Sequence, residues 1–116
     1  LETRDFVYLH VEAPDEAGHS GNLEHKIQAI EDFDAQVVGP VLEGMKKFGE
    51  YRVLCMPDHP TPLSLMTHTS DPVPFVLYKG ETEANPRIAG YDEDSARGMN
   101  LVIEDGFRMM ELMLKK

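Results

Sequence analysis

The chain has 116 residues, of which 41% are hydrophobic and 28% charged, and these proportions are those of one folded domain rather than a disordered segment. Acidic residues outnumber basic ones by 21 to 11. The resulting net charge of −10 disfavours nucleic acid and anionic membrane surfaces as partners, because phosphate groups would be repelled. No apolar stretch is long enough to span a membrane, the N-terminus lacks the layout of a signal peptide, and a single cysteine cannot form an internal disulfide. We therefore expect a cytoplasmic protein, and since the sequence begins at Leu1 without Met, we expect a piece of a longer one.

The first predicted element is a strand. Residues 5–12 are almost continuously apolar between charged ends, which is typical of a strand at the centre of a sheet. Ala13 and Pro14 are expected to end this strand. Residues 15–21 contain two glycines and are predicted to form a loop.

A long amphipathic helix is predicted over residues 23–48, with Ser20 or Asn22 as its N-cap. Apolar side chains recur at steps of three and four residues and predict one buried face. They are Leu23, Ile27, Ile30, Phe33, Val37, Val41, Met45 and Phe48. The Gly39-Pro40 pair interrupts this pattern and predicts a kink or a break, and Gly49 is placed to end the helix.

The rest of the chain completes a predicted α/β fold. Residues 51–56 form the second predicted strand, so that strand, helix and strand make a right-handed βαβ unit with parallel strands. A helix-free loop leads to a third strand, residues 73–78, for which the antiparallel direction is the easier connection. Residues 79–96 are predicted as loop and residues 99–116 as a terminal amphipathic helix. The predicted sheet is therefore mixed, with helices packed on it.

Five Asp and His side chains are predicted to meet at one edge of this sheet. Asp15 and His19 follow the carboxyl end of the first predicted strand, and Asp58 and His59 follow that of the second. The carboxyl ends of two parallel strands lie at the same edge of a sheet, and this is the edge where α/β proteins bind ligands. The two pairs are therefore expected to be close together. An antiparallel third strand would start at that edge and bring His68 to it.

These side-chain types predict a metal centre. Carboxylates and neutral imidazoles suit Mn²⁺ or Zn²⁺, and five of them exceed what one catalytic metal with an open position takes from protein. The pattern therefore indicates two ions, which would clamp the attacking and leaving oxygens in phosphoryl transfer. Pro57, Pro60 and Pro62 stiffen the chain around the Asp-His pair.

Other reactive residues have simpler interpretations. A single His is more often a surface or hydrogen-bonded residue than a ligand, so His10 and His25 are not assigned to a site. Cys55 lies inside a predicted strand and is interpreted as inert core. No Gly-rich phosphate loop or nucleophile elbow is present, and no neighbouring base marks a threonine after the second strand as a nucleophile. These threonines are Thr61, Thr67 and Thr69.

Three motifs in order carry a resemblance to a known family. They are His10-Val-Glu-Ala-Pro-Asp-Glu-Ala-Gly-His-Ser-Gly21, Pro57-Asp-His-Pro-Thr-Pro62 and Thr67-His-Thr-Ser-Asp-Pro-Val-Pro-Phe75. With these motifs the chain resembles the C-terminal part of the cofactor-independent phosphoglycerate mutases, and most closely their archaeal-type branch, within the alkaline phosphatase superfamily. The resemblance runs from about Asp5 to the terminal helix.

The resemblance implies a fold, a reaction and a role for each site residue. Residues 1–116 would be a single partial domain, the C-terminal portion of the metal-binding phosphatase-like domain, which is an α/β/α sandwich. The family interconverts 3-phosphoglycerate and 2-phosphoglycerate in glycolysis through a phosphoserine or phosphothreonine enzyme intermediate at a two-metal site, commonly with Mn²⁺, and Mg²⁺, Zn²⁺ or Co²⁺ are further possible ions. By motif, the ligands of one ion would be Asp15, His19 and His68, and those contributed to the second ion would be Asp58 and His59.

The resemblance also implies a division of labour along the family's chain. The nucleophile, the remaining ligands and the substrate-handling domain would come from the N-terminal part, so this piece alone is expected to be inactive and to bind metal weakly. Three alternatives stay open at this point. The parent could instead be a phosphopentomutase or a metal-dependent phosphate-ester hydrolase of the same superfamily, the chain could be a non-catalytic metal-binding module, or the Asp58-His59 turn could only cap a loop.

Overall fold

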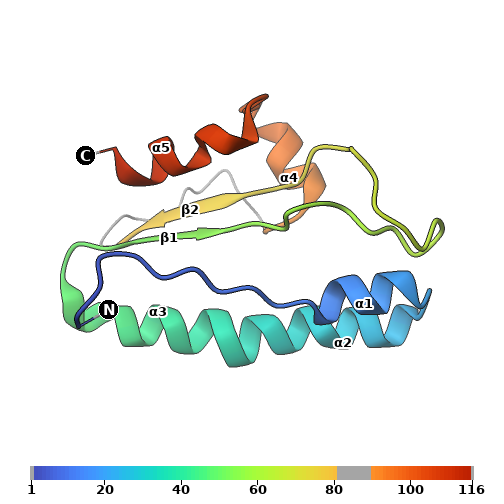
Figure 1. The fold of residues 1–116 in the computed structure, drawn as a ribbon, viewed down its shortest axis with the longest axis horizontal. Coiled ribbons are helices and arrows are strands. Elements are labelled where there is room, and N and C mark those ends of the chain that lie inside the picture. Colours follow the sequence, from blue (N-terminus) through green and yellow to red (C-terminus); the bar gives the residue numbers. More distant parts are fainter. Residues whose placement is uncertain (1, 81–89, 116) are drawn as a thin grey trace. The chain divides into compact units, whose positions relative to one another are not determined.

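A computed structural model of the chain describes residues 2–80 and 90–115, shown in Figure 1. The chain divides into two compact units. The first comprises Leu1–Pro40 and Thr61–Thr69, and the second comprises Val41–Pro60 and Ser70–Lys116. Among the described residues, no helix is both long and apolar enough to cross a membrane.

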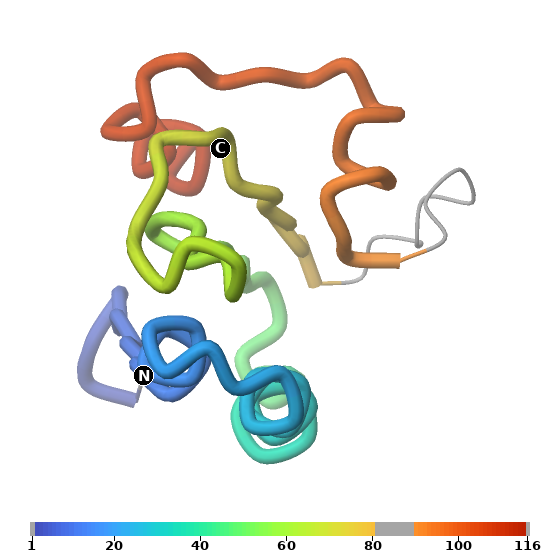
Figure 2. Tube along the Cα trace, turned by 90° about the vertical axis from the view of Figure 1, so that its right-hand side faces the viewer, coloured from blue at the N-terminus to red at the C-terminus, as the bar shows by residue number. Residues whose placement is uncertain are grey.

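The first unit is built on two packed helices, α1 (Ala13–His19) and α2 (Leu23–Phe33). Pro14 lies in the first turn of α1, where a missing N–H costs nothing because that group has no partner within the helix. Asn22 caps α2 by accepting a hydrogen bond from the His25 backbone N–H at 3.0 Å. The two helices lie side by side in Figures 1 and 2, and Ala17 of α1 is buried with 7% of its surface exposed.

Three further helical segments follow α2 without an intervening loop: η1 (Asp34–Val38), α3 (Gly39–Met45) and η2 (Lys46–Phe48). The turn η1 is a π-helix, in which the Gly39 N–H donates to the Asp34 carbonyl oxygen five residues earlier. This wider turn comes just before Pro40, whose ring would clash with a carbonyl of a regular α-helix. The predicted interruption at Gly39-Pro40 is therefore confirmed. Gly49 ends the run with a φ of +70°, as expected for a glycine in this place.

The second unit contains the sheet, in which β1 (Arg52–Cys55) pairs antiparallel with β2 (Val76–Lys79). Cys55 faces Val76 in this register and is half-buried within the strand. Arg52 also donates a hydrogen bond of 2.7 Å from Nη1 to the Met113 carbonyl oxygen, which ties β1 to α5 (Met109–Leu114). The second and third predicted strands, and the antiparallel direction of the third, are confirmed.

Two shorter helical elements precede α5 in the second unit, α4 (Glu93–Gly98) and η3 (Gly106–Arg108). Asp92 caps α4 by accepting from the Ser95 N–H at 2.7 Å. Tyr91 donates from its hydroxyl to the Pro74 carbonyl oxygen at 3.0 Å, and burial raises the pKa of this hydroxyl strongly. The segment before β2 and the start of α4 are thereby joined through one side chain.

The predicted first strand is wrong. No residue of 5–12 is assigned to a strand, and Tyr8 and Leu9 expose 71% and 60% of their surfaces. A strand needs a neighbouring backbone for its N–H and C=O groups, and apolar composition alone does not supply one. The structure therefore does not confirm the parallel βαβ unit, although helices and a small antiparallel sheet are compatible with an α/β class.

Several other boundaries differ from the sequence prediction. Residues 15–21 were expected to be loop, but Asp15 to His19 belong to α1, because Pro14 starts a helix as readily as it ends a strand. The predicted loop 79–96 includes the start of α4 at Glu93, and its residues 81–89 lie outside the described ones. The terminal helix begins only at η3, since residues 101–105 adopt no helix.

The predicted buried face of the long helix is also wrong in its first turns. Leu23, Ile27 and Ile30 expose 58%, 49% and 52% of their surfaces. Within the first unit the surface that packs against α2 is the short helix α1, which is too small to cover the whole apolar stripe.

Candidate metal centre

Asp15 and His19 are brought together by the helix α1. They are four residues apart, and side chains at this spacing lie one above the other on the same helix face. The His19 Nε2 lies 3.4 Å from the Asp15 Oδ2. The expected closeness of Asp15 and His19 is thus observed, on a helix instead of the expected loop, and their role as metal ligands stays a prediction.

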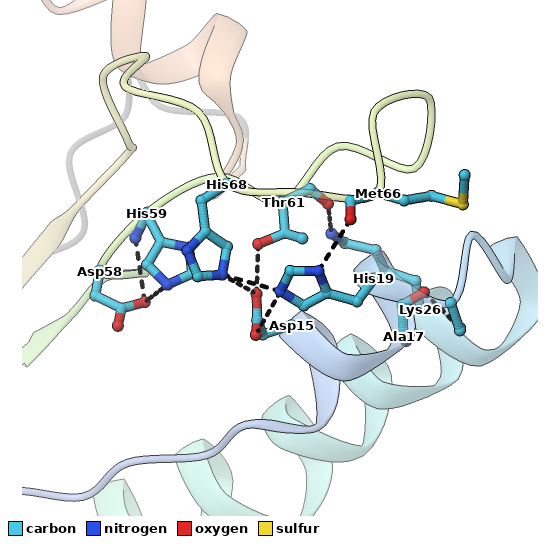
Figure 3. A network of polar contacts seen from close by, with 10 residues as sticks. Asp15, Ala17, His19, Lys26, Asp58, His59, Thr61, Met66 and His68 are labelled. Atoms are coloured by element: carbon cyan, nitrogen blue, oxygen red, sulfur yellow. Dashed lines mark hydrogen bonds and ion pairs between the residues drawn. The ribbon is translucent and has the colours of Figure 1, made fainter.

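The loop Thr61–Thr69 of the same unit adds His68 to this pair. The His68 Nε2 lies 3.3 Å from the Asp15 Oδ1 and 3.0 Å from the His19 Nε2. The two imidazole rings are tilted by 52° with centroids 4.9 Å apart. Figure 3 shows both rings beside Asp15. We call Asp15, His19 and His68 the DHH cluster. Its side chains are one third to one half exposed, so solvent ions can reach it.

The hydrogen bond on the other side of His19 determines which ring nitrogen faces the cluster. The His19 Nδ1 lies 3.0 Å from the Met66 carbonyl oxygen (Figure 3). A carbonyl only accepts, so Nδ1 carries the hydrogen, and in the neutral ring the Nε2 lone pair points toward Asp15 and His68. This orientation by a backbone carbonyl is the usual arrangement behind a metal-binding imidazole.

Met66 holds this carbonyl in an uncommon backbone conformation. Its φ is +53°, in the left-handed region that residues other than glycine rarely adopt. The turn before it is closed by the hydrogen bond from the Met66 N–H to the Pro62 carbonyl oxygen, at 2.9 Å. Such outliers persist where the surroundings require them, which is common at functional sites. No sequence pattern identified Met66, because its contribution comes from the backbone alone.

The spacing of the DHH cluster fits a divalent cation. For ligand distances of about 2.1 Å, neighbouring ligands lie about 3.0 Å apart in an octahedron and about 3.4 Å apart in a tetrahedron. In the cluster the two imidazole Nε2 atoms are 3.0 Å apart, and they lie 3.4 and 3.3 Å from the two different oxygens of the Asp15 carboxylate, Oδ2 for His19 and Oδ1 for His68. One carboxylate and two imidazoles are also a donor set that Zn²⁺ and Mn²⁺ accept.

A buried threonine completes the surroundings of Asp15. Thr61 exposes 5% of its surface and donates from Oγ1 to the Asp15 Oδ1 at 2.5 Å (Figure 3). The sequence analysis noted Thr61 but gave it no role. Its position between Pro60 and Pro62 was the available signal, because two prolines restrict the backbone at that point.

The other predicted pair, Asp58 and His59, belongs to the second unit and follows β1 as expected. The Asp58 Oδ1 accepts a hydrogen bond from the His59 N–H at 3.1 Å and lies 3.5 Å from the His59 Nε2 (Figure 3). The Asp58 side chain is 61% exposed and that of His59 28%. The convergence of this pair with the DHH cluster stays a prediction.

The described residues thus combine helices and a small antiparallel sheet, compatible with an α/β protein, with a candidate site for a divalent metal ion. In agreement, a family model described as the metalloenzyme superfamily matches residues 1–116, and the chain belongs to this superfamily.

Curated relatives place the chain near one kind of enzyme. It is 71% identical over 116 residues to a protein of Geobacter sulfurreducens named "Probable 2,3-bisphosphoglycerate-independent phosphoglycerate mutase", and the match covers 100% of the chain and 29% of that protein. Proteins named 2,3-bisphosphoglycerate-independent phosphoglycerate mutase from Methanothrix thermoacetophila and Methanosarcina mazei are 50% and 41% identical, over 96% and 99% of the chain. The chain spans 27% and 29% of the length of these two proteins. No solved structure matches the chain.

Proposed function

We propose that the chain is the C-terminal portion of the phosphatase-like domain of a metal-dependent phosphoglycerate mutase. The whole enzyme would interconvert 3-phosphoglycerate and 2-phosphoglycerate in glycolysis, in the cytoplasm, without a bisphosphoglycerate cofactor. The observation that carries this proposal is the DHH cluster, whose ligand atoms are 3.0 to 3.4 Å apart. The printed names of the relatives, above all the 71% identical one, support this reaction over others of the superfamily.

The chain's part in this reaction is to hold metal. Asp15, His19 and His68 would bind one ion, and Asp58 and His59 would contribute two ligands to a second. By the resemblance we expect Mn²⁺, with Mg²⁺, Zn²⁺ or Co²⁺ as further possible ions for these donors. When bound, two such ions neutralise the charge of a transferring phosphoryl group and orient the oxygens on either side of it.

The two predicted ligand sets are linked through the covalent chain. A single residue, Pro60, separates His59 from Thr61, and each Cα step is about 3.8 Å. On the strength of this short connection in the sequence, we propose that the two ligand sets serve one binuclear centre.

The phosphoryl-accepting hydroxyl is proposed to lie in the N-terminal part of the parent enzyme, together with the remaining ligands of the second ion. Residues 1–116 would thus form one partial domain. The net charge of −10 agrees with this division, because a phosphorylated acid needs basic groups that this part of the enzyme is short of. The substrate would be gripped chiefly by residues outside the chain.

Activity and metal measurements on the full-length enzyme test this proposal. We expect conversion of 3-phosphoglycerate to 2-phosphoglycerate with Mn²⁺, loss of activity with a chelator, and its return when Mn²⁺ is restored. The variant His68→Gln should lose metal and activity together. His25→Gln is the matched control, since His25 lies in the exposed first turn of α2 outside the cluster.

Defined results would overturn the proposal. A full-length protein that interconverts phosphopentoses or hydrolyses phosphate esters, but leaves phosphoglycerates unchanged, would support another reaction of the superfamily. Unchanged metal content in His68→Gln would remove the DHH cluster from the centre. Turnover by residues 1–116 alone would refute the division of the active site between this chain and the rest of the enzyme.

A further inference from the structure

The carboxylate of Asp15 is held by a side chain that has no assigned function. The Thr61 hydroxyl donates to the Asp15 Oδ1 at 2.5 Å, while the Asp15 Oδ2 is the oxygen closer to His19. Since a carboxylate rotates freely about its last bond, a hydrogen bond to one oxygen sets the direction of both. Thr61 thus determines how Asp15 faces the two imidazoles.

Thr61 is itself fixed from two directions. The Lys26 ammonium group of α2 donates to the Thr61 carbonyl oxygen at 2.5 Å. Beside this ammonium group, Gly18 of α1 leaves the space that Thr61 fills. A Cβ at Gly18 would lie 2.7 Å from the Thr61 oxygen and 2.8 Å from its Cγ2. With 5% of its surface exposed, Thr61 is among the most buried of the described residues.

This arrangement is more specific than the packing of a threonine requires. A threonine that only filled space between α1 and α2 would need its methyl group, and its hydroxyl could bond to a nearby helix carbonyl. Here the hydroxyl instead meets a carboxylate of the DHH cluster, 46 residues earlier in the sequence. Groups that orient metal ligands in this way commonly contribute 10- to 100-fold to metal affinity.

We propose that Thr61 is a positioning residue for the metal ion of the DHH cluster. It acts through Asp15, by presenting the carboxylate to the ion in one orientation, and Lys26 and Gly18 keep Thr61 in place. This inference rests on the proposed metal centre, and the experiment is designed so that the two can fail separately.

The test compares two substitutions of Thr61 in the full-length protein. Thr61→Val keeps the shape and both methyl-sized branches but removes the hydroxyl, whereas Thr61→Ser keeps the hydroxyl and removes the methyl group. Thr67→Val is the matched control on the same loop, because Thr67 is exposed. Mn²⁺ affinity is measured by calorimetry, ligand geometry by the visible spectrum of bound Co²⁺, and folding by thermal unfolding without metal.

The expected result is a loss of Mn²⁺ affinity by about 10- to 100-fold in Thr61→Val, with a changed Co²⁺ spectrum. Thr61→Ser should retain most of the affinity and the original spectrum, and Thr67→Val should match wild type in every measurement. The metal-free melting temperature of Thr61→Val should stay well above the temperature of the titration.

Three results would overturn the inference. Unchanged affinity and spectrum in Thr61→Val would show that the hydroxyl does not orient Asp15. An equal loss in Thr61→Ser would assign the effect to the methyl group packed against Gly18. If wild type bound no Mn²⁺ and Asp15→Asn behaved identically, the proposed metal centre would itself fail, and the role of Thr61 with it.

Discussion

The close approach of Thr61 to Gly18 predicts an unusual result for an alanine substitution in a helix. Alanine at position 18 would place its Cβ 2.7 Å from the Thr61 oxygen and 2.9 Å from the Lys26 Nζ. Ordinary contacts of a Cβ begin at 3.4 Å, so the loop would have to withdraw by about 0.7 Å. The atom in the way is a backbone carbonyl oxygen, which cannot turn aside as a flexible side chain can.

Two opposing free energies decide the outcome. Replacing a helical glycine by alanine is worth up to about 1 kcal/mol in helix propensity. Overpacking in a region that cannot relax costs about 1–3 kcal/mol. Gly18→Ala should therefore be neutral or destabilising by as much as about 2 kcal/mol, and it should also weaken Mn²⁺ binding, because Thr61 moves away from Asp15.

Gly44→Ala is the matched control, since Gly44 lies in α3 and a Cβ there meets nothing within 4 Å. It should stabilise the protein by about 0.5–1 kcal/mol, because only the propensity term remains. Urea unfolding of the full-length protein measures how much each substitution changes the free energy of unfolding. The difference between the two changes should be close to the overpacking cost of about 1–3 kcal/mol. Equal stabilisation by the two substitutions, with unchanged Mn²⁺ affinity, would refute the contact between Gly18 and Thr61.

Three further predictions concern the helix caps and the hydrogen-bonded Tyr91. Asn22→Ala should destabilise the protein by about 1 kcal/mol in thermal unfolding. Asn22→Asp should retain the stability, since both Asn and Asp cap the first free N–H groups. Equal effects of the two substitutions would exclude a capping role for Asn22. The hydrogen bonds from the Ser95 N–H and hydroxyl hold the pKa of Asp92 below its ordinary value of 3.8. The contribution of Asp92 to stability is therefore present above pH 3.8 and is lost as the pH falls through the lower pKa of the folded state. Amide exchange in α4 should show this loss in wild type and not in Asp92→Asn, which keeps a cap without the titration. Desolvation raises the pKa of Tyr91, so its contribution to stability is present below about pH 10 and is lost as the pH rises toward the folded value. An ultraviolet titration should lose one late-ionising tyrosine in Tyr91→Phe relative to wild type.

Local signals in the sequence predicted the local structure well. Asn22 as a cap, the interruption at Gly39-Pro40 and the end at Gly49 all follow from chemistry within a few residues, and the structure confirms them. The antiparallel strand 73–78 was found because a helix-free connection favours that direction, and it corresponds to β2.

Signals that depend on partners far along the chain were less informative. The apolar run 5–12 has strand composition, yet none of its residues is assigned to a strand, and several of its large side chains are exposed. Residues 15–19 combine a glycine with a preceding proline, and this composition suits a loop and the first turns of a helix equally. Packing of α1 against α2 decides between them.

The donor types of the candidate site, by contrast, were determined by the sequence alone. Asp15 and His19 at a spacing of four can reach one ion from a helix, and His68 is a third donor of the same kind. Which atoms face the ion was decided only by the tertiary structure. The Met66 carbonyl selects the His19 nitrogen, and the Thr61 hydroxyl sets the Asp15 carboxylate, from a loop more than 40 residues away. Spacing along a helix is a local property, whereas the direction of a lone pair depends on hydrogen bonds that exist only after the loop has packed.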